Sequence, residues 1–391
     1  MSDRLSCRRA AFLALAITSL AIASAARAQV DPPSSGDLFS FPGAFPNPAS
    51  PMSAGRALAD RWLGDAPWDD PAAGGGWSVE GSLLYLRDDR QDLRAANRQF
   101  DGGSGLFDFG SAALSAPLPG RVTLWLYSFP AEARSEDVAF YAGRGTDPTQ
   151  PSALVTAKTD TREVRSGGGF SRAFGALRLG VAVEVTNRTD DWTRTLESGA
   201  PESGTRTTSW KGNATGGQAG FRWTHGDSGA GQIVVGGGLR RLPELEVSGS
   251  NHTDLLIGST DSSLTTHRES GWEGGVSASW RVNDAVRLFA GGGTRTAMAW
   301  SGLAMTSGRW ATGALAVDYH DPTTPWTVRA GYALDQQSEV PEESAGSLGL
   351  SFGWDFTGAM AEVGVLHRAV HRSSEPTSHE DRVLVGIRAT F

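Results

Sequence analysis

The sequence has almost no cysteine: the single one, Cys7, precedes an apolar stretch near the N-terminus. The rest of the chain therefore has no disulfide bond to stabilise it, and Cys7 cannot be the lipid-bearing cysteine of a lipoprotein, which follows the apolar stretch. Lysine is also scarce, with only Lys158 and Lys211. The formal net charge is −8, whereas a nucleic-acid-binding protein would more often be basic. These deficits argue against a disulfide-stabilised domain, a lipoprotein and a nucleic-acid binder.

The first 28 residues resemble a secretory leader. "MSDRLSCRR" carries three arginines, "AAFLALAITSLAIASAA" is apolar, and Ala26-Arg27-Ala28 has the small-x-small pattern of a cleavage site. The alternative is an N-terminal membrane anchor, but the apolar run is short. We expect a signal peptide over 1–28. It contains four arginines and one aspartate, so the charge without it is −8 − 3 = −11.

Long hydrophobic runs are absent as well. After residue 28 no segment approaches the ~20 apolar residues of a membrane helix, and few segments have a helical period. The chain instead has 50 glycines and 13 tryptophans. Residues 29–75 are rich in Pro, Gly, Asp and Ala without a sustained period, which predicts an ordered plug or a loose arm. From Trp77 onward, period-two alternation dominates and predicts an all-β fold.

Alternation alone leaves two architectures open. In 347–356 and 326–335, apolar and aromatic residues alternate with small, polar or charged ones. A soluble sandwich would bury the apolar faces against each other. A membrane barrel would turn them toward lipid and the polar faces toward the lumen.

The lengths of the connections favour the barrel. Every second connection is short, as in "PLPG", "GDS", "ND" and "DPTTP", whereas the first four of the others are long: 88–107, 131–152, 187–204 and 247–263. Short turns at one rim and long loops at the other are typical of outer-membrane barrels. The expected strands lie near 76–87, 108–116, 121–130, 153–171, 174–186, 205–225, 229–246, 264–282, 285–298, 306–319, 325–336, 344–356, 358–372 and 379–391.

We therefore predict a transmembrane antiparallel β-barrel of about 14 strands over 76–391, in the bacterial outer membrane. The chain ends on "HEDRVLVGIRATF", an alternating strand whose terminal Phe391 resembles the assembly signal of outer-membrane proteins. This strand should pair with the first one near Trp77. The expected partners are outer-membrane lipid, lipopolysaccharide and the barrel assembly machinery, and we expect a monomer.

Several short motifs have structural explanations. "GDSG" (226–229) is expected in a hairpin turn, and Ser351 of "GLSFG" lies mid-strand, whereas a nucleophile elbow needs a strand-turn-helix. His367 and His371 share a strand face but lack a third ligand. The glycine triplets 236–238 and 291–293 lack the Lys-Ser/Thr of a phosphate loop and should relieve crowding instead. We expect no catalytic residues, no metal and no cofactor, and hence no enzyme.

The arrangement resembles the FadL/TodX-type outer-membrane transporters of fatty acids and other hydrophobic compounds. The segments that carry the resemblance are "SAGRALADRWLGDAPWDDPAA", "LWLYSFP", "GGQAGFRWTHGDSGAGQIVVGGGLRR" and "WTVRAGYALDQQSEVPEE". One departure is that Asn47-Pro48-Ala49 comes early, whereas the acidic pair Asp69-Asp70 is followed directly by Pro71.

The resemblance implies a plugged transporter for a hydrophobic small molecule. Residues 36–72 would form the plug, with Asn47, Pro48, Asp69 and Asp70 in its motifs. The Phe129-Pro130 break would be the irregularity of a wall strand that releases the ligand sideways, because proline cannot donate to the ladder; a simple strand end is the alternative.

Charged residues on the polar strand faces should line the lumen. An arginine there could hold a carboxylate head group, although pairing with lumen carboxylates is the alternative. The arginines proposed as lumen or ligand residues are Arg178, Arg222, Arg281, Arg287, Arg295 and Arg329. Two other functions stay open on sequence grounds: a porin-like channel for small polar solutes, supported by these charges, and a structural or secretion-associated barrel without transport.

Overall fold

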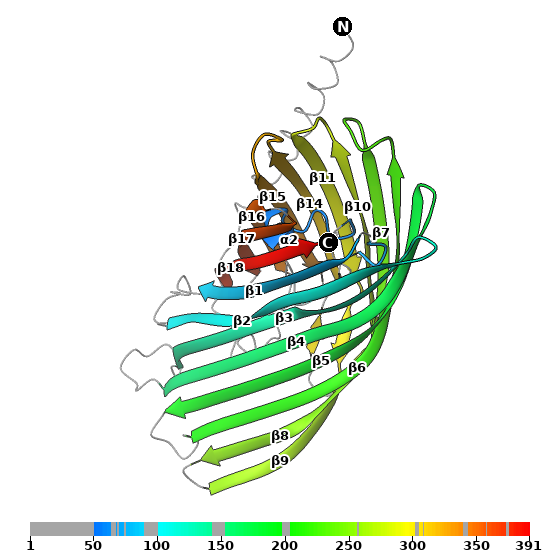
Figure 1. Ribbon diagram of the computed structural model, residues 1–391. Helices are drawn as coiled ribbons and strands as arrows, with labels where there is room; N and C mark the ends of the chain where they lie inside the picture. Colours follow the sequence, from blue (N-terminus) through cyan, green and yellow to red (C-terminus); the bar gives the residue numbers. More distant parts are fainter. Residues whose placement is uncertain are drawn as a thin grey trace.

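The chain forms a sloping β-barrel whose long strands dominate Figure 1, the computed structural model of the 391-residue protein. The structure describes residues 51–63, 68, 70–73, 76–89, 101–142, 153–197, 204–255, 258–301, 305–307, 309–338, 343–356, 358–372 and 375–391. Within these ranges, helix α2 (Pro51–Gly55) is one short turn of chain inside the barrel. None of the described helices is long and apolar enough to cross a membrane.

Strands make up nearly all of the rest. They are β1 (Ser78–Asp89), β2 (Asp101–Leu118), β3 (Val122–Ala142), β4 (Ala153–Phe174), β5 (Leu177–Glu197), β6 (Gly204–His225), β7 (Ile233–Leu242), β8 (Leu245–Leu255), β9 (Gly258–Arg268), β10 (Gly271–Arg281), β11 (Val286–Arg295), β12 (Met298–Trp300), β13 (Met305–Ser307), β14 (Arg309–His320), β15 (Trp326–Ser338), β16 (Glu343–Phe356), β17 (Ala359–Arg372) and β18 (Glu375–Thr390).

These strands occupy 14 positions in the wall, because four positions are each interrupted by a short break. Strand β6 pairs with β7 over its C-terminal part and with β8 over its N-terminal part, so β7 and β8 are two halves of one wall position. The same holds for β9 with β10, β11 with β12, and β13 with β14. The predicted 14-stranded antiparallel barrel is therefore confirmed.

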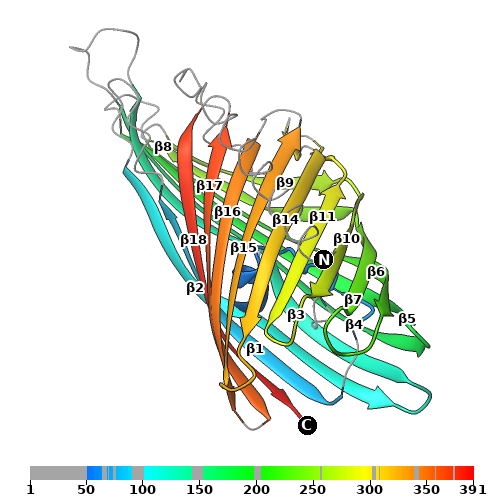
Figure 2. The same ribbon diagram turned by 90° about the horizontal axis from the view of Figure 1, so that it is seen from above.

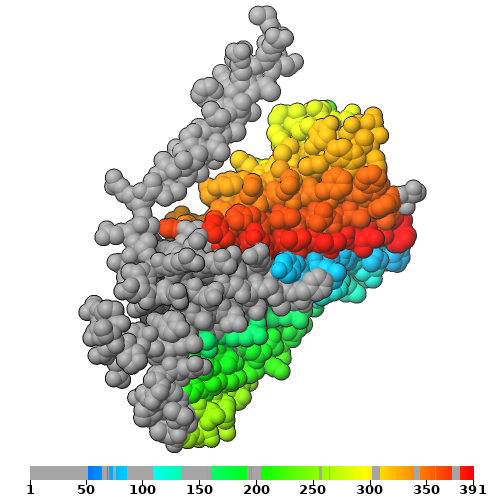
Figure 3. Space-filling model, turned by 90° about the vertical axis from the view of Figure 1, so that its left-hand side faces the viewer, coloured from blue at the N-terminus to red at the C-terminus, as the bar shows by residue number. Residues whose placement is uncertain are grey.

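The wall closes between its first and last strands. Strand β1 pairs with β18 from Ser78↔Thr390 to Asp89↔His379, and Phe391 donates a backbone hydrogen bond to the Trp77 carbonyl at 2.9 Å. In the space-filling view of Figure 3, the last strand (red) lies directly against the first (blue). Closure gives every strand two neighbours and removes the sheet edges.

The outer face carries a broad apolar band. On β5, the exposed residues are every second one from Leu177 to Val185, and above them the exposed positions become polar at Asn187 and Asp191. Nine residues at about 3.3 Å each span about 30 Å of strand, and the tilt of barrel strands brings this close to the apolar height of outer-membrane barrels. The apolar series thus faces outward and the polar series faces the lumen.

Three expected strand ends were wrong. Strand β2 begins at Asp101, within the predicted loop 88–107. Strand β3 continues to Ala142 and β5 to Glu197, each 21 residues long, whereas the sequence predicted long loops from 131 and from 187. The predicted loop 247–263 likewise contains most of the β8–β9 hairpin. Figure 2 shows these strands continuing to one side well past the shorter C-terminal ones. The reason is that the sequence of these outer halves, such as "NRTDDWTRT" of β5, has no sustained apolar alternation, so the period that marks a membrane strand is lost.

The opposite rim has tight turns. Gly175 and Gly358 adopt positive φ values of 64° and 84° at two of them, a conformation that disfavours side chains with a Cβ. "GDSG" lies in the turn between β6 and β7, and Ser351 lies within β16. In the turn before β15, the Asp321 side chain accepts hydrogen bonds from the hydroxyl and backbone N–H of Thr323, which lower the pKa of Asp321.

Candidate functional site: the lumen and its lateral seam

The described part of the N-terminal region lies against the inside of the wall. We call residues 51–63, 68 and 70–73 the inner segment. It begins beside β16 and β17 at α2 and reaches β4, where the Ser171 hydroxyl donates to the Ala73 carbonyl at 2.6 Å. Ala54, Ala57 and Ala72 are completely buried. The inner segment therefore crosses much of the lumen's circumference in close contact with it.

Glycines in the wall make room for this contact. A Cβ on Gly220 of β6 would lie 2.6 Å from the Pro71 ring, and one on Gly238 of β7 would collide with the Trp62 indole. Further along, Gly331 faces the Arg56 backbone. The inward-facing glycines that meet the inner segment are Gly180, Gly220, Gly236, Gly238, Gly275, Gly291, Gly331 and Gly349. We call them the glycine row; it includes Gly236 and Gly238 of one glycine triplet and Gly291 of the other.

Ion pairs fasten the inner segment along its length. The Arg56 guanidinium donates to Asp318 of β14, with one of the two contacts at 2.9 Å, and to Asp60 at 2.7 Å. Arg61 pairs with Glu273 of β10. These partners are all buried, so each charge depends on the other for compensation.

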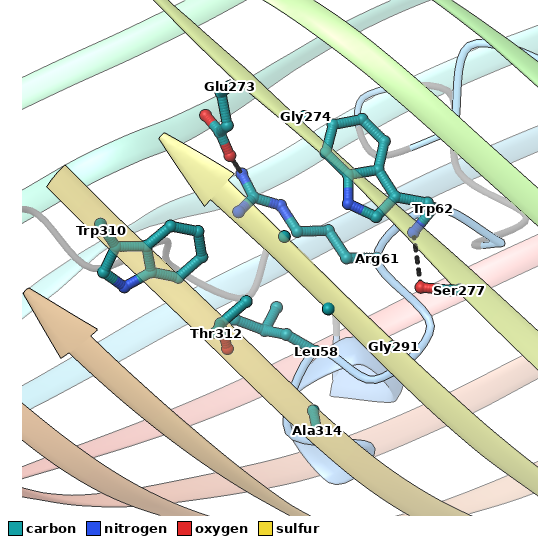
Figure 4. A pocket seen from close by; sticks show the side chains of 12 residues that line it. Leu58, Arg61, Trp62, Glu273, Gly274, Ser277, Gly291, Trp310, Thr312 and Ala314 are labelled. Atoms are coloured by element: carbon teal, nitrogen blue, oxygen red, sulfur yellow. Dashed lines mark hydrogen bonds and ion pairs between the residues drawn. The ribbon is translucent and has the colours of Figure 1, made fainter. Parts of the chain in front are cut away.

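Little space remains between the inner segment and the wall at this point. Figure 4 shows a cavity between Leu58, Arg61 and Trp62 on one side and strands β10, β11 and β14 on the other. Its volume is about 10 Å³, about the space of one water molecule. The Trp62 backbone N–H points at the Ser277 hydroxyl across the interface at 3.4 Å.

A larger ion cluster lies inside the barrel and is linked to the inner segment through Glu273, which pairs with Arg61 and is 4.0 Å from Arg165. Glu163 of β4 accepts hydrogen bonds from Arg165 at 2.8 Å, Arg188 at 3.3 Å and Arg268 at 2.6 Å. Arg188 also pairs with Asp190 at 2.8 Å. Arg188 and Arg268 lie 5.2 and 6.0 Å from the centre of the Trp300 ring, within cation–π range. None of the described residues form a group of three or more His, Cys, Asp or Glu that could hold a metal ion.

Aromatic side chains line the inside of β3. Trp125, Tyr127 and Phe129 are at most 5% exposed and follow one another at 5.5 and 6.0 Å between ring centres. Trp68 of the inner segment adds a fourth ring, 6.3 Å from Phe129. Arg240 donates to the Trp68 carbonyl and pairs with Glu184 at 3.1 Å. The inner segment thus ends against an aromatic ladder.

The wall has an unpaired seam beside this ladder. Residues Gly103–Ser111 of β2 and Phe129–Asp137 of β3 do not pair with each other, although each stretch stays paired with its other neighbour. Both strands are bulged at the seam, because Gly110 has no partner in β1 and Ala131 has none in β4. Pro130, which lacks an N–H, directly precedes the second bulge.

The two bulges compensate each other. Above the seam Asp101 pairs with Ala139, and below it Ala112 pairs with Ser128, in the same register. Nine residues of each strand therefore separate without displacing the ladder on either side. The sequence-predicted Phe129 and Pro130 lie at the lower end of this seam, within a strand that continues beyond them.

The predicted lumen arginines do not form one site. Arg178 and Arg222 lie near the end of the inner segment, where Arg222 is 3.7 Å from buried Asp70. Arg281 and Arg287 lie at the tight-turn rim, and Arg281 is 3.6 Å from Asp284. These are contacts at the edge of the lumen.

The remaining two predicted arginines lie deeper. Arg329 pairs with Glu362 and is 3.5 Å from Asp318, so it shares a carboxylate with Arg56. Arg295 is buried but pairs with no described residue. The predicted plug residues Asn47, Pro48 and Asp69 lie outside the described residues. His367, which the sequence placed on a strand face with His371, faces outward, and its Nδ1 is 2.7 Å from the Asp381 carboxylate.

Sequence reasoning missed the charges that fasten the inner segment and the aromatic ladder. Arg56, Asp60 and Arg61 stand in a segment without a strand or helix period, so nothing in it indicated which side chains meet the wall. For the ladder a signal exists: in "LWLYSFP" both faces are apolar, with Leu124 and Leu126 outside and the aromatic rings inside. A membrane strand that is apolar on both faces has an apolar contact in the lumen.

Comparison with solved structures gives the fold independently. A Pseudomonas aeruginosa FadL homologue matches with a TM-score of 0.62 at 12% identity, covering 89% of this chain and 100% of that chain. The toluene transporters TbuX of Ralstonia pickettii and TodX of Pseudomonas putida each match with a TM-score of 0.60 at 12% identity, covering 88% of this chain and 98% of theirs. The chain has the fold of the FadL-type barrels. No protein-family model and no curated protein matches the sequence.

Proposed function

We propose that this protein transports hydrophobic small molecules across the outer membrane through a plugged barrel, with the β2–β3 seam as the exit from the lumen. Residues 29–75 act as the plug, of which the inner segment is the described part. The ligand enters from the side of the long strands and leaves laterally into the bilayer. Lateral release spares an apolar ligand the passage through water.

The observation that carries the proposal is the seam between Gly110 and Ala131. It opens the ladder over nine residues of each strand without disturbing the register elsewhere, and the aromatic ladder ends beside it at Phe129 and Trp68. An apolar, π-rich surface next to an unpaired stretch of wall suits the passage of an apolar molecule. The matching solved barrels are described as toluene transporters and a monoaromatic hydrocarbon channel, which supports this class of ligand.

A porin-like channel for polar solutes is less well supported. Such a channel needs an open aqueous lumen, whereas the inner segment and the Glu163 cluster bury their charges in mutual contact. The third possibility is a barrel without transport, and the uptake experiment below distinguishes it from a transporter.

Location and partners follow from the same proposal. Residues 1–28 direct export as a cleaved signal peptide, the barrel assembly machinery inserts the monomer, and outer-membrane lipid and lipopolysaccharide contact the apolar band. The ligand is a hydrophobic small molecule, with fatty acids and hydrocarbons as the classes to test.

Deleting Gly110 and Ala131 together tests the exit. Each deletion removes one bulge and leaves the flanking register unchanged, so the pair should close the seam with a regular ladder. We expect uptake of radiolabelled toluene and oleate by cells lacking other such transporters to fall at least tenfold, while heat-modifiable gel migration stays that of a folded barrel.

The control is Gly313→Val on β14, where an added side chain meets no atom within 4 Å; its uptake should equal that of the unmodified protein. Unchanged uptake in the double deletion would refute the seam as the exit. Absence of uptake of both compounds by the unmodified protein would refute transport and favour the non-transport barrel.

A further inference from the structure

Most of strand β9 has a free edge. On one side β9 pairs with β8 along its whole length, from Leu255↔Gly258 to Leu245↔Arg268. On its other side, within the part of the chain that the structure describes, it pairs only with the short strand β12, at Arg268↔Trp300. Figure 1 shows β9 as the last strand at that margin of the extended wall. Residues 258–265 therefore have a neighbouring described strand on one side only.

Contacts with Ser301 show which backbone groups lie on this edge. Ser301 donates its backbone N–H to the His267 carbonyl at 2.8 Å, and its hydroxyl accepts from the His267 N–H at 3.1 Å. Both backbone groups of His267 thus point away from β8. Backbone groups alternate in direction along an antiparallel strand, so every second residue before His267 points the same way. These residues are Ser259, Asp261, Ser263 and Thr265.

The edge is accessible and lacks the usual protection. Residues 258–263 and Thr265 are all exposed. Natural sheets guard an open edge with proline, lysine or a bulge, but 258–265 contain neither residue, and β9 pairs with β8 without a shift in register. Four residues therefore present N–H and C=O groups that an added strand can bind.

The free edge lies beyond the apolar band. Strand β6, which lies on the other side of β8, exposes Arg206 and Lys211 where it pairs with β8. Its exposed apolar residues Phe221 and Trp223 lie at the opposite end of the strand. The edge of β9 is therefore on the side of the long strands, where water rather than lipid surrounds the wall.

A second copy of this chain in the same membrane does not fit the edge. Two β9 edges related by a two-fold axis need an axis perpendicular to the wall when the strands are antiparallel, or along the strands when they are parallel. The wall of a barrel stands upright in the membrane and its strands are tilted, so neither axis is perpendicular to the membrane. Either pairing would turn the second copy out of its membrane orientation.

The charge beside the edge indicates the kind of partner. The exposed face of the β8–β9 hairpin has three carboxylates, those of Glu246, Asp254 and Asp261. The other ionisable residues of the two strands are two histidines and Arg268, and Arg268 is buried against Glu163. An added strand with lysine or arginine on its outward face complements these carboxylates.

We propose that the free edge of β9 binds an extended, basic peptide segment of a partner protein by strand addition. About eight residues of the partner, roughly 27 Å of strand, continue the wall position that begins with β12. They exchange backbone hydrogen bonds with β9, and their basic side chains lie on the outward face near Asp261. The site does not depend on the transport proposed above.

Three synthetic peptides test the proposal on the full-length mature barrel in lipid nanodiscs. The first is a fluorescein-labelled decapeptide of alternating threonine and lysine. In the second the backbone nitrogens of the lysines are methylated, and in the third those of the threonines. A residue opposite Asp261 has its side chain on the same face and its N–H toward β9. Methylated lysines therefore lose the bonds to β9, whereas methylated threonines keep them.

Fluorescence anisotropy should show saturable binding of the first and third peptides. The second should bind at least tenfold more weakly, because several backbone hydrogen bonds are lost. The two methylated peptides have the same charge, so equal binding would mean adsorption by charge alone and would overturn the proposal. Absence of binding by the first peptide, as when another segment of this chain covers the edge, would also overturn it.

Ser263→Pro locates the site. It removes one N–H from the middle of the free edge and no bond to β8, and proline is tolerated on edge strands. Ser263→Ala is the control, because it removes the hydroxyl and keeps the N–H. The first peptide should bind Ser263→Pro at least tenfold more weakly than Ser263→Ala. Equal binding would place the peptide elsewhere and overturn the proposal.

A charge variant keeps the test decisive if Ser263→Pro does not fold. Asp261→Lys leaves the backbone unchanged, and the exposed Asp261 side chain has no role in the barrel core. Like charges opposite each other in a sheet are destabilising, so the lysine peptide should bind this variant at least fivefold more weakly. Unchanged binding to Asp261→Lys would contradict the proposed position of the basic side chains.

Discussion

At the scale of single residues, the buried charges in the lumen are compensated by neighbouring side chains of opposite charge. Glu163 is 2% exposed and serves three arginines at once. On the same strand, Asp160 meets Lys158 at 3.6 Å with both side chains largely exposed. The two carboxylates are three residues apart, yet their burial differs so much that we expect very different contributions to the free energy of unfolding.

Replacing Glu163 by Gln should destabilise the barrel by about 3–5 kcal/mol, because it leaves buried guanidinium groups without their counter-charge. Asp160→Asn should change stability by less than about 1 kcal/mol. Denaturant unfolding of the two variants in liposomes, followed by tryptophan fluorescence, measures the difference. Equal stability of the two variants would contradict the buried-cluster interpretation.

Histidines near the long-strand rim illustrate the opposite, solvent-exposed case. The Asp261 side chain lies 2.6 Å from His252 in the β8–β9 hairpin and raises the pKa of that histidine through a hydrogen bond and its charge. Both side chains are largely exposed, so the pair contributes to local charge rather than to the core.

At the scale of elements, the glycine row explains how an irregular segment is held. Gly180 of β5 and Gly220 of β6 both face Pro71, so backbone lies against backbone where a side chain would normally intervene. The sequence indicated that the glycine triplets relieve crowding, but it could not indicate what crowds them. That information lies in the pairing of distant parts of the chain, since Trp62 reaches strands more than 170 residues away.

Gly180→Val should therefore displace the end of the inner segment from the wall. The added side chain would collide with the Pro71 carbonyl, at a cost of about 1–3 kcal/mol for overpacking. We expect larger single-channel conductance in planar bilayers and faster proteolysis near residue 71 than in Gly313→Val, where the same substitution meets open space. Unaltered conductance together with unaltered proteolysis would show that the segment does not depend on this contact.

The strands themselves were predictable to differing degrees. Strands β15 and β16 follow their predicted bounds closely, because each has a polar face and an apolar face throughout. The outer halves of β3 and β5 were not predictable, since "AEARSEDVA" and "NRTDDWTRT" have no sustained apolar alternation and resemble loops. Only one side of the seam could be predicted from the sequence. Pro130 indicated an irregularity in β3, but nothing distinguished Gly110 from the neighbouring small residues of β2.

At the scale of the whole molecule, the number of strands could be predicted because closure constrains it. Short turns at one rim require strands to come in pairs, and the alternating C-terminal strand required a partner near the N-terminus. The ion clusters could not be predicted, because each joins residues from three or more strands. Glu163 and Arg268 are 105 positions apart, and only the circumference of the barrel brings them together.

Removing Phe391 should impair assembly. Its backbone N–H holds the Trp77 carbonyl at the junction of the first and last strands, and its side chain is 82% exposed on the outer face. We expect a severalfold lower yield of heat-modifiable barrel in outer-membrane fractions, with Phe391→Tyr as the control that keeps an aromatic end. A normal yield without Phe391 would contradict its role as an assembly signal.

The course of the inner segment has a consequence for the order of biogenesis. It touches β16 and β15 near its start and β5 and β4 near its end, so its complete binding surface exists only once the wall from β4 to β16 has formed. The inner segment, which precedes every described strand in the sequence, is therefore among the last parts to reach its final place. The wall must therefore form before the inner segment can bind to it.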